Sequence, residues 1–210
     1  MASAHSDTHG GAAAVPAFTA HKILVAGGFG AGKTTLVGAI SEVRPLQTEE
    51  ALTSASIGLD DLTGGGGKTT TTVALDFGRI TISDSLVLYL FGVPGQERFW
   101  FMWDELAYGA LGAIVLGDVR RLGDCFPSVN YFETRGLPFV VAVNCFDGAP
   151  RYDLGEVRLA LDLDEDVPLM LTDARNQASV KNTLIRLVES IAADGEGLAP
   201  AQGRRIIAGR

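Results

Sequence analysis

The sequence predicts a doubly wound α/β fold, because short apolar runs alternate along the chain with segments of helical periodicity. The first apolar run, residues 22–26, leads into a glycine-rich loop, and a helical pattern over residues 35–40 follows. Alternation of this kind produces a mostly parallel sheet with helices on both faces, and ligands bind at the carboxyl ends of its strands. The 210 residues, 47% of them hydrophobic, suffice for one domain with a sizeable core.

The glycine-rich loop, residues 27–34, spells G-x-x-x-x-G-K-T. In this P-loop pattern consecutive backbone N–H groups surround a polyphosphate, while Lys33 contacts the β- and γ-phosphates and the Thr34 hydroxyl binds Mg²⁺. The following helix directs its N-terminus at the anion. The chain is therefore predicted to be a P-loop NTPase. The predicted phosphate-binding residues are Gly30, Ala31, Gly32, Lys33, Thr34 and Thr35.

The remaining elements follow in order. Residues 44–68 show no clear periodicity and include four consecutive glycines, so we expect a long loop, which in a compact domain is usually functional. A hairpin is expected over residues 72–91. Together with the first strand and three later apolar runs, it gives a sheet of about six strands. Those further strands are predicted at 110–116, 137–143 and 168–171, and helices at 127–134, 154–161 and 180–192.

Composition excludes several classes of function. Asp and Glu number 25 against 17 Lys and Arg, and this net charge of −8 argues against a nucleic-acid-binding surface. No run approaches about 18 uninterrupted apolar residues, so no membrane span is expected. The two cysteines, Cys125 and Cys145, fit a reducing compartment. We expect a cytoplasmic protein, which a partner could recruit to a membrane, with its domain over residues 21–193.

The segments outside that domain have a different character. Residues 1–20 are mostly small and polar without periodicity, and we expect a disordered N-terminal tail there. Residues 194–210 are expected to form a flexible C-terminal tail.

Four motifs in one order resemble those of the Ras, Rab and Arf GTPases. After the P-loop, residues 72–77 (T-V-A-L-D-F) resemble a switch I segment, and residues 95–99 (G-Q-E-R-F) follow the hairpin. Residues 144–147 (N-C-F-D) stand where the family has N-K-x-D, and residues 172–175 (T-D-A-R) stand where it has the S-A-K loop. The resemblance covers about residues 22–192 and implies a Ras-like G domain.

A narrower likeness is to bacterial Ras-like small GTPases. Residues 93–96 (V-P-G-Q) match MglA-type polarity GTPases, and the threonine run 69–72, taken with residues 91–99, resembles the GTPases of actinobacterial conservon operons. This conservon-type resemblance implies a roadblock-domain partner and a sensor-kinase-like protein.

The resemblance assigns roles around the phosphates. Thr72 would complete the Mg²⁺ and γ-phosphate contacts when GTP is bound, and the Gly95 N–H would contact the γ-phosphate. Gln96 would be the catalytic residue that orients the attacking water. Any of the four threonines 69–72 could be the acting one, and the ordinary alternatives are a strand threonine for Thr72 and a surface amide for Gln96.

Guanine binding is assigned in the same way. Asp147 would accept hydrogen bonds from guanine N1–H and the 2-amino group, which adenine cannot offer, although Asp147 could also be a plain turn residue. Asn144 would hold the loop and reach the base, and the Ala174 N–H would donate to guanine O6. The predicted guanine-binding residues are Asn144, Asp147, Asp173, Ala174 and Arg175.

Three positions depart from the family pattern. Gly92 replaces the acidic residue of D-x-x-G, so the carboxylate that holds a Mg²⁺ water is absent there, as it is in MglA-type proteins. Cys145 replaces the lysine whose stem covers the guanine, which predicts weaker base affinity. Phe29 occupies a position that is usually glycine, and its ring is expected either to fill space near the phosphates or to turn outward onto a switch.

Hydrolysis is expected to be slow, because Thr71 rather than an arginine precedes Thr72. Arg79 and Arg98 are the nearest candidates by sequence for an arginine acting in cis, and neither is compelling. Two alternatives stay open: a GTP-binding module without hydrolysis, which Phe29 and Gly92 would favour, and a small P-loop kinase, which would need a lid with arginines.

Residues 99–103 (F-W-F-M-W) contain both tryptophans of the chain. A helix cannot bury five large apolar side chains in sequence, so at least two are expected at the surface, where they would bind a partner. The alternative is that they belong to the core. The predicted partner-binding residues are Phe99, Trp100, Phe101 and Trp103. The whole pattern predicts a Mg²⁺-dependent GTPase switch.

Overall fold

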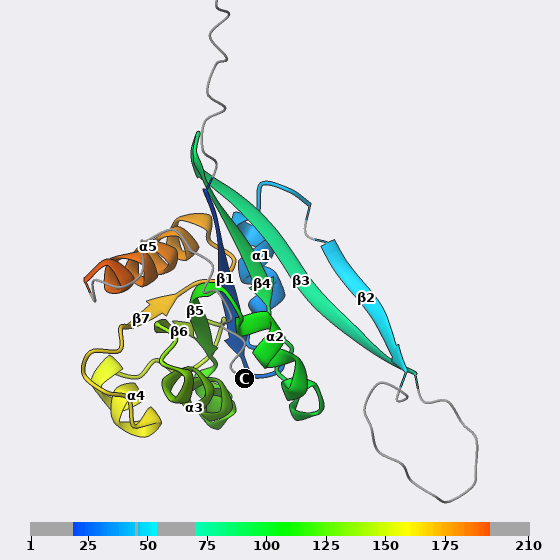
Figure 1. Ribbon diagram of the computed structural model, residues 1–210. Helices are drawn as coiled ribbons and strands as arrows, with labels where there is room; N and C mark the ends of the chain where they lie inside the picture. The colour runs from blue at the N-terminus through cyan, green and yellow to red at the C-terminus, as the bar shows by residue number, and fades with distance from the viewer. Residues whose placement is uncertain (1–18, 45, 54–69, 194–210) are drawn as a thin grey trace, which may run out of the picture.

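The computed structural model describes residues 19–44, 46–53 and 70–193, in which one sheet of seven strands has helices on both faces (Figure 1). The strands lie in the order β2-β3-β4-β1-β5-β6-β7. This is the doubly wound α/β arrangement that the sequence predicts. β1 already begins at Thr19, whereas most of the predicted N-terminal tail and all of the C-terminal one lie outside the described residues.

Five strands form the parallel part of the sheet. Every residue of one of them, β6, is buried, as expected for a strand covered on both faces. The hairpin is also present, since β3 (Thr70–Ser83) runs antiparallel to β4. The parallel strands are β1 (Thr19–Gly27), β4 (Leu86–Gly92), β5 (Ala110–Gly117), β6 (Phe139–Asn144) and β7 (Leu169–Thr172).

The helices divide between the two faces, and none in the described ranges is both long and apolar enough to cross a membrane. Side chains alternate along β1: Ile23 and Val25 pack with α1 and α5, while Leu24 and Ala26 pack with α2, α3 and α4. Full burial of each such aliphatic side chain contributes roughly 1.5–3 kcal/mol. The helices are α1 (Lys33–Ile40), α2 (Trp103–Ala107), α3 (Phe126–Arg135), α4 (Leu154–Leu161) and α5 (Gln177–Ala193), with 3₁₀ segments η2 (Glu97–Met102) and η3 (Val119–Cys125).

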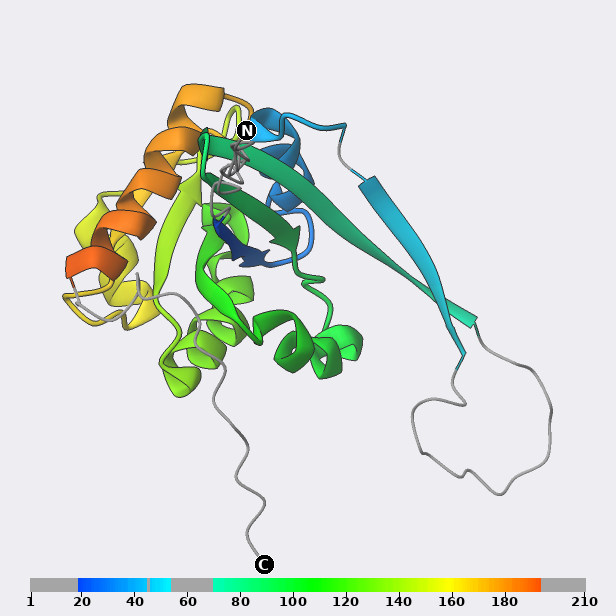
Figure 2. The same cartoon turned by 45° about the horizontal axis from the view of Figure 1, so that its top comes forward.

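One strand lies where the sequence predicts only a loop. β2 (Leu46–Thr53) pairs antiparallel with β3 from Leu46–Phe77 to Thr53–Thr70 and is the seventh strand of the sheet. Both views show β2 and the start of β3 extending away from the helices (Figures 1 and 2). The sequence of β2, L-Q-T-E-E-A-L-T, does not alternate apolar and polar residues, so it does not predict a strand. The strand is defined by its backbone pairing with β3.

Candidate functional site

The P-loop connects the end of β1 to the start of α1 at the carboxyl edge of the sheet. Gly30 and Gly32 have φ of 76° and 106°, a left-handed conformation that side chains disfavour. Gly32 caps α1 without a side-chain hydrogen bond, and the first turn holds no acidic residue. Neither a capping side chain nor an acidic residue of that turn serves its N–H groups, which is the arrangement of an anion site.

Lys33 crosses this loop and is held by its carbonyl groups. Its Nζ donates to the carbonyl oxygens of Gly27 and Gly28 at 2.9 and 2.8 Å. Burial lowers the pKa of Lys33 to about 8, although the nearby Asp76 carboxylate opposes this change. The ammonium group thus lies in a partly desolvated site, where a phosphate would stabilise its charged form.

Asp76 is the main site residue that sequence reasoning missed. It lies on β3 directly opposite Gly92 of β4, it is buried, and its Oδ2 accepts a hydrogen bond of 2.7 Å from the Thr34 hydroxyl. An ideal Cβ at Gly92 would lie 2.9 Å from that same Oδ2. The structure therefore places a carboxylate beside Gly92 from the neighbouring strand, and only the hairpin register could have revealed this.

The donor set around Thr34 fits Mg²⁺. A hydroxyl and a carboxylate are hard oxygen ligands, and Mg²⁺ is commonly held by one or two protein oxygens together with waters and substrate phosphates. Within the described ranges no three His, Cys, Asp or Glu side chains gather into a metal-binding group of their own. Thr34 and Asp76 are the residues that would hold the ion.

Gly95 and Gln96 approach the P-loop from the other side. A Cβ at Gly95 would lie 2.5 Å from the Gly27 carbonyl oxygen and 3.1 Å from Lys33 Nζ, so only glycine permits this contact. Gln96 precedes η2 and lines the same pocket of about 450 Å³. The pocket is lined by Phe29, Gly30, Gly32, Lys33, Thr34, Thr35, Asp76, Gly92, Val93, Pro94, Gly95, Gln96 and Phe99.

Thr72 belongs to a part of β3 that does not pair with β4, and Arg79 lies at the other end of α1 from the P-loop. Thr72 is four residues before Asp76, in the extended part of β3 that pairs with β2 at Ala51 rather than with β4 (Figure 2). The side chains of Thr72 and Arg98 lie outside the described part of the structure. The Arg79 N–H donates to Ser41 Oγ, at the far end of α1 from Lys33, a helix length of roughly 12 Å.

A different arginine lies beside the P-loop. Arg121 of η3 donates from Nη2 to the Phe29 carbonyl oxygen at 2.7 Å. Asp118 and Asp124 hold its guanidinium at 3.8 and 3.9 Å. Arg121 could not be predicted from the sequence, since η3 carries no motif. The Phe29 side chain itself is exposed and also lines the pocket.

Asn144 joins the P-loop to the loop after β7. Its Nδ2 donates to the Ala31 carbonyl oxygen at 2.9 Å, and its Oδ1 accepts from the Ala174 N–H at 3.0 Å. Asn144 is buried at the end of β6, so both bonds are shielded from water. The Ala174 N–H differs from expectation, because it donates to Asn144 instead of being free for guanine O6.

The residues expected to meet the base lie at the ends of β6 and β7. Asp147 and Asp173 both form ion pairs with Arg175. Beside Cys145, the Phe146 ring is covered by the Arg120 guanidinium, 4.1 Å from the ring centroid. An aromatic ring with a stacked arginine therefore stands next to the position from which the family's lysine would cover the base.

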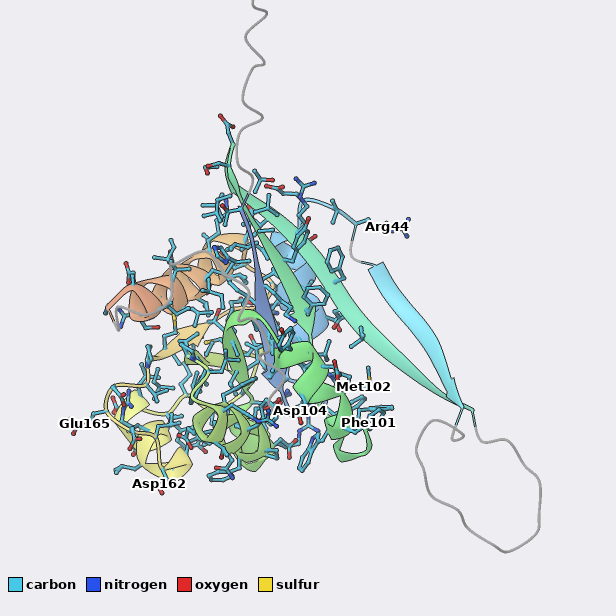
Figure 3. The ribbon with its side chains drawn as sticks, viewed as in Figure 1. Arg44, Phe101, Met102, Asp104, Asp162 and Glu165 are labelled. Atoms are coloured by element: carbon cyan, nitrogen blue, oxygen red, sulfur yellow. The ribbon has the colours of Figure 1, made fainter. Side chains whose placement is uncertain are left out.

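The aromatic run divides between core and surface. Phe99 and Trp103 are buried, whereas Trp100 and Phe101 are 37% and 51% exposed, so two of the four predicted partner-binding residues present their rings to solvent. Trp103 Nε1 donates to the Pro94 carbonyl oxygen at 3.1 Å, which ties α2 to the segment before Gly95. Figure 3 shows Phe101 and Met102 at the outer edge of this helical segment.

Comparisons with known proteins agree with this geometry. The family model described as "Conserved hypothetical ATP binding protein" matches residues 25–194. The uncharacterized protein MJ1339 of Methanocaldococcus jannaschii is 31% identical over 78 residues, 36% of this chain and 50% of that protein. The chain thus spans about half the length of the curated relative it matches.

Two solved structures share the fold. The G domain of the T. maritima FeoB iron transporter superimposes with a TM-score of 0.55 and 18% identity, over 85% of this chain and all of that one. The cytosolic domain of the same transporter in apo form gives a TM-score of 0.57 and 16% identity, over 82% of this chain and 64% of that one. At these identities the likeness shows the fold alone, that of a P-loop G domain.

Proposed function

The chain belongs to the family described as conserved hypothetical ATP binding proteins, and from this premise we propose that it is a Mg²⁺-dependent GTP-binding switch with slow GTP hydrolysis. It would signal through two segments whose contacts depend on the γ-phosphate: residues 72–77 as switch I and residues 95–107 as switch II. Conformational release of such segments after hydrolysis is the established mode of G-domain switching.

The observation that carries this proposal is the double hydrogen bond of Asn144. One side chain fixes the spacing between the P-loop, at Ala31, and the loop that would meet the base, at Ala174. A site built this way supports recognition of the phosphates and the base of one nucleotide, rather than of an isolated phosphate group.

The residues around the phosphates divide the chemistry. Lys33 and the N–H groups of the P-loop would neutralise the β- and γ-phosphates. Mg²⁺, when bound through Thr34 with the help of Asp76, would add charge stabilisation at the same phosphates. Gln96, beside Gly95 in the same pocket, would orient the attacking water. Arg121 is hydrogen-bonded to the Phe29 carbonyl oxygen and paired with Asp118 and Asp124, which supports slow hydrolysis without an arginine on the γ-phosphate.

The base is proposed to be guanine, and ATP binding is the second candidate because the family description names ATP. Asp147 decides between them, since guanine offers its carboxylate two donors and adenine offers none there. In competition for labelled GDP, we expect GTP to displace the label at a concentration about tenfold or more below that of ATP. Equal displacement would favour the ATP-binding reading.

Hydrolysis is tested by single turnover of bound GTP. Gln96→Leu should bind GTP like the wild type and hydrolyse it more slowly, because the amide that positions water is lost. Glu105→Gln, on the exposed side of α2, is the matched control. If the wild type shows no turnover even with a partner present, the protein is a GTP-binding module without hydrolysis.

The proposed partners are a roadblock-domain protein and a sensor-kinase-like protein, as the conservon-type resemblance implies. The exposed rings of Trp100 and Phe101 support a docking surface on switch II. A purified roadblock-domain protein should bind the GTP-analogue-loaded and GDP-loaded forms with different affinities. Trp100→Ala should weaken that binding, whereas Tyr108→Ala, also exposed and just beyond α2, should not.

A further inference from the structure

Arg175 holds the carboxylate that is proposed to read the base. Its Nη1 lies 2.6 Å from Asp147 Oδ2 and its Nη2 lies 3.1 Å from Asp147 Oδ1. The guanidinium therefore faces both oxygens of Asp147 at once, in the planar fork geometry that gives an arginine–carboxylate pair its directionality.

The other side of the same guanidinium is anchored within its own loop. Arg175 Nε and Nη2 lie 2.9 and 3.1 Å from the two oxygens of Asp173, and the Arg175 backbone N–H donates to Asp173 Oδ1 at 3.0 Å. These hydrogen bonds lower the pKa of Asp173, and the hydrogen bonds from Arg175 lower the pKa of Asp147 as well. Both carboxylates are thus ionised partners of one cation.

The two partners are not equivalent. The Asp173 side chain is 35% exposed and bonded to the backbone of its own loop, whereas the Asp147 side chain is 85% exposed. A guanidinium that loses Asp147 therefore keeps Asp173. This asymmetry makes the Arg175–Asp147 contact the exchangeable one of the two.

Guanine needs the same edge of Asp147 that Arg175 occupies. N1–H and the 2-amino group form a fork of two donors, which matches a carboxylate edge-on as a guanidinium does. Two such forks cannot share one edge in the same plane. Adenine presents no donor pair to this carboxylate, so binding of an adenine nucleotide does not separate Asp147 from Arg175.

We infer that Arg175 is a specificity-determining residue that covers Asp147 in the nucleotide-free protein, so that guanine binds only by displacing it. The inference rests on the proposed function, because it takes Asp147 as the base-reading carboxylate. It follows that Arg175 lowers the affinity for guanine nucleotides and leaves the affinity for adenine nucleotides unchanged. The ratio of the two affinities is therefore smaller than it would be without Arg175.

The test compares the affinities of fluorescently labelled GDP and ADP for the full chain and its variants. Arg175→Ala should bind GDP about two- to fivefold more tightly than the wild type, the range that an exposed ion pair supports, with ADP binding unchanged. Arg186→Ala, which removes an arginine paired with Glu189 on α5, is the control for loss of one positive charge. Added salt should raise the GDP/ADP affinity ratio of the wild type, because it screens the pair, and should not raise that of Arg175→Ala.

A double-mutant cycle with Asp147→Asn separates the possible results. If Asp147→Asn leaves the GDP/ADP ratio unchanged, the base assignment and this inference both fail. If Asp147→Asn lowers the ratio but Arg175→Ala does not raise it, this inference alone is overturned. If Arg175→Ala no longer raises the ratio in the Asp147→Asn background, the result supports displacement of Arg175 by guanine. If Arg175→Ala still raises it there, Arg175 acts without Asp147 and the inference is overturned. Weaker binding of both nucleotides by Arg175→Ala would show that its charge attracts phosphate instead.

Discussion

Asp76 and Gly92 face each other across the β3–β4 pair, and the carboxylate of one fills the space that a side chain on the other would need. A Cβ at Gly92 would lie 2.8 Å from the Asp76 Cβ. The acidic group and the glycine are therefore two halves of one arrangement. The carboxylate on β3 reaches Thr34, and the small residue opposite it on β4 leaves the space for it.

We predict that Asp76→Asn reduces the contribution of Mg²⁺ to nucleotide affinity. The amide keeps the size of the carboxylate but loses its charge, and loss of such a partner typically costs about 10- to 100-fold in metal affinity. The measurement is the GDP dissociation rate with Mg²⁺ and with EDTA. Asp84→Asn, in the exposed turn of the same hairpin, is the control. A wild-type ratio of the two rates in Asp76→Asn would remove Asp76 from the metal site.

A strand exchange sharpens this test. Asp76→Gly combined with Gly92→Asp moves the carboxylate from β3 to β4 while keeping one large and one small partner in the pair. We expect the double variant to recover part of the Mg²⁺ dependence that Asp76→Gly alone loses. No recovery, in a double variant with an unchanged circular dichroism spectrum, would mean that the carboxylate serves the hairpin and not the ion.

The pH dependence of nucleotide binding should report on Lys33. Because its pKa lies at about 8 in the free protein, Lys33 loses its proton as the pH rises through that value. Binding a triphosphate favours the charged ammonium, so above pH 8 binding must take up a proton, and affinity should fall by up to about tenfold per pH unit. Calorimetry in two buffers with different ionisation enthalpies measures this uptake.

Lys33→Ala provides the matching variant. It should lose tight triphosphate binding and proton uptake together, while its fold remains, since Lys33 contacts loop carbonyls and not the apolar core. Proton uptake that persists in Lys33→Ala would assign the titration to another group.

Cys145→Lys should slow GDP release, because the lysine stem would cover the base that the cysteine leaves open. Cys145→Ser, which keeps the length of the side chain, is the control and should release GDP like the wild type. Equal release rates for the wild type and Cys145→Lys would indicate that Phe146, held by Arg120, already covers the base.

Intrinsic fluorescence should distinguish the GDP-loaded protein from the GTP-analogue-loaded one. Trp103 is bonded to the Pro94 carbonyl oxygen, next to the Gly95 N–H that would contact the γ-phosphate, so a change at that phosphate reaches the indole through one residue. Trp100→Phe should retain most of the difference and Trp103→Phe should lose it. Gly95→Ala should also lose it, because its methyl would collide with the Gly27 carbonyl oxygen. Identical spectra for the two loaded wild-type forms would argue for a static nucleotide-binding protein.

The sequence could predict the P-loop because its geometry depends on contiguous residues: glycines with positive φ, then Lys33 at the start of α1. Asp76 could not be assigned in the same way, since its role depends on which residue of β4 stands opposite, and that follows from hairpin register. The partner of the Ala174 N–H likewise depends on how the end of β6 and the loop after β7, 30 residues apart in the chain, come together. β2 was not predicted because its pairing with β3 is made by the backbone, which leaves no periodic pattern of side chains in the sequence.

The hydrogen bond from Thr34 to Asp76 also fixes a direction in space. A hydroxyl has one proton and two lone pairs, and here the proton is committed to a carboxylate. The Thr34 oxygen can then only accept, and the orientation of the hydroxyl about the Cβ–Oγ bond is fixed before any ligand binds. An incoming cation meets a lone pair that needs no reorientation, while an incoming hydrogen-bond acceptor meets repulsion. The orientation of the Thr34 hydroxyl alone thus makes this position favour a cation.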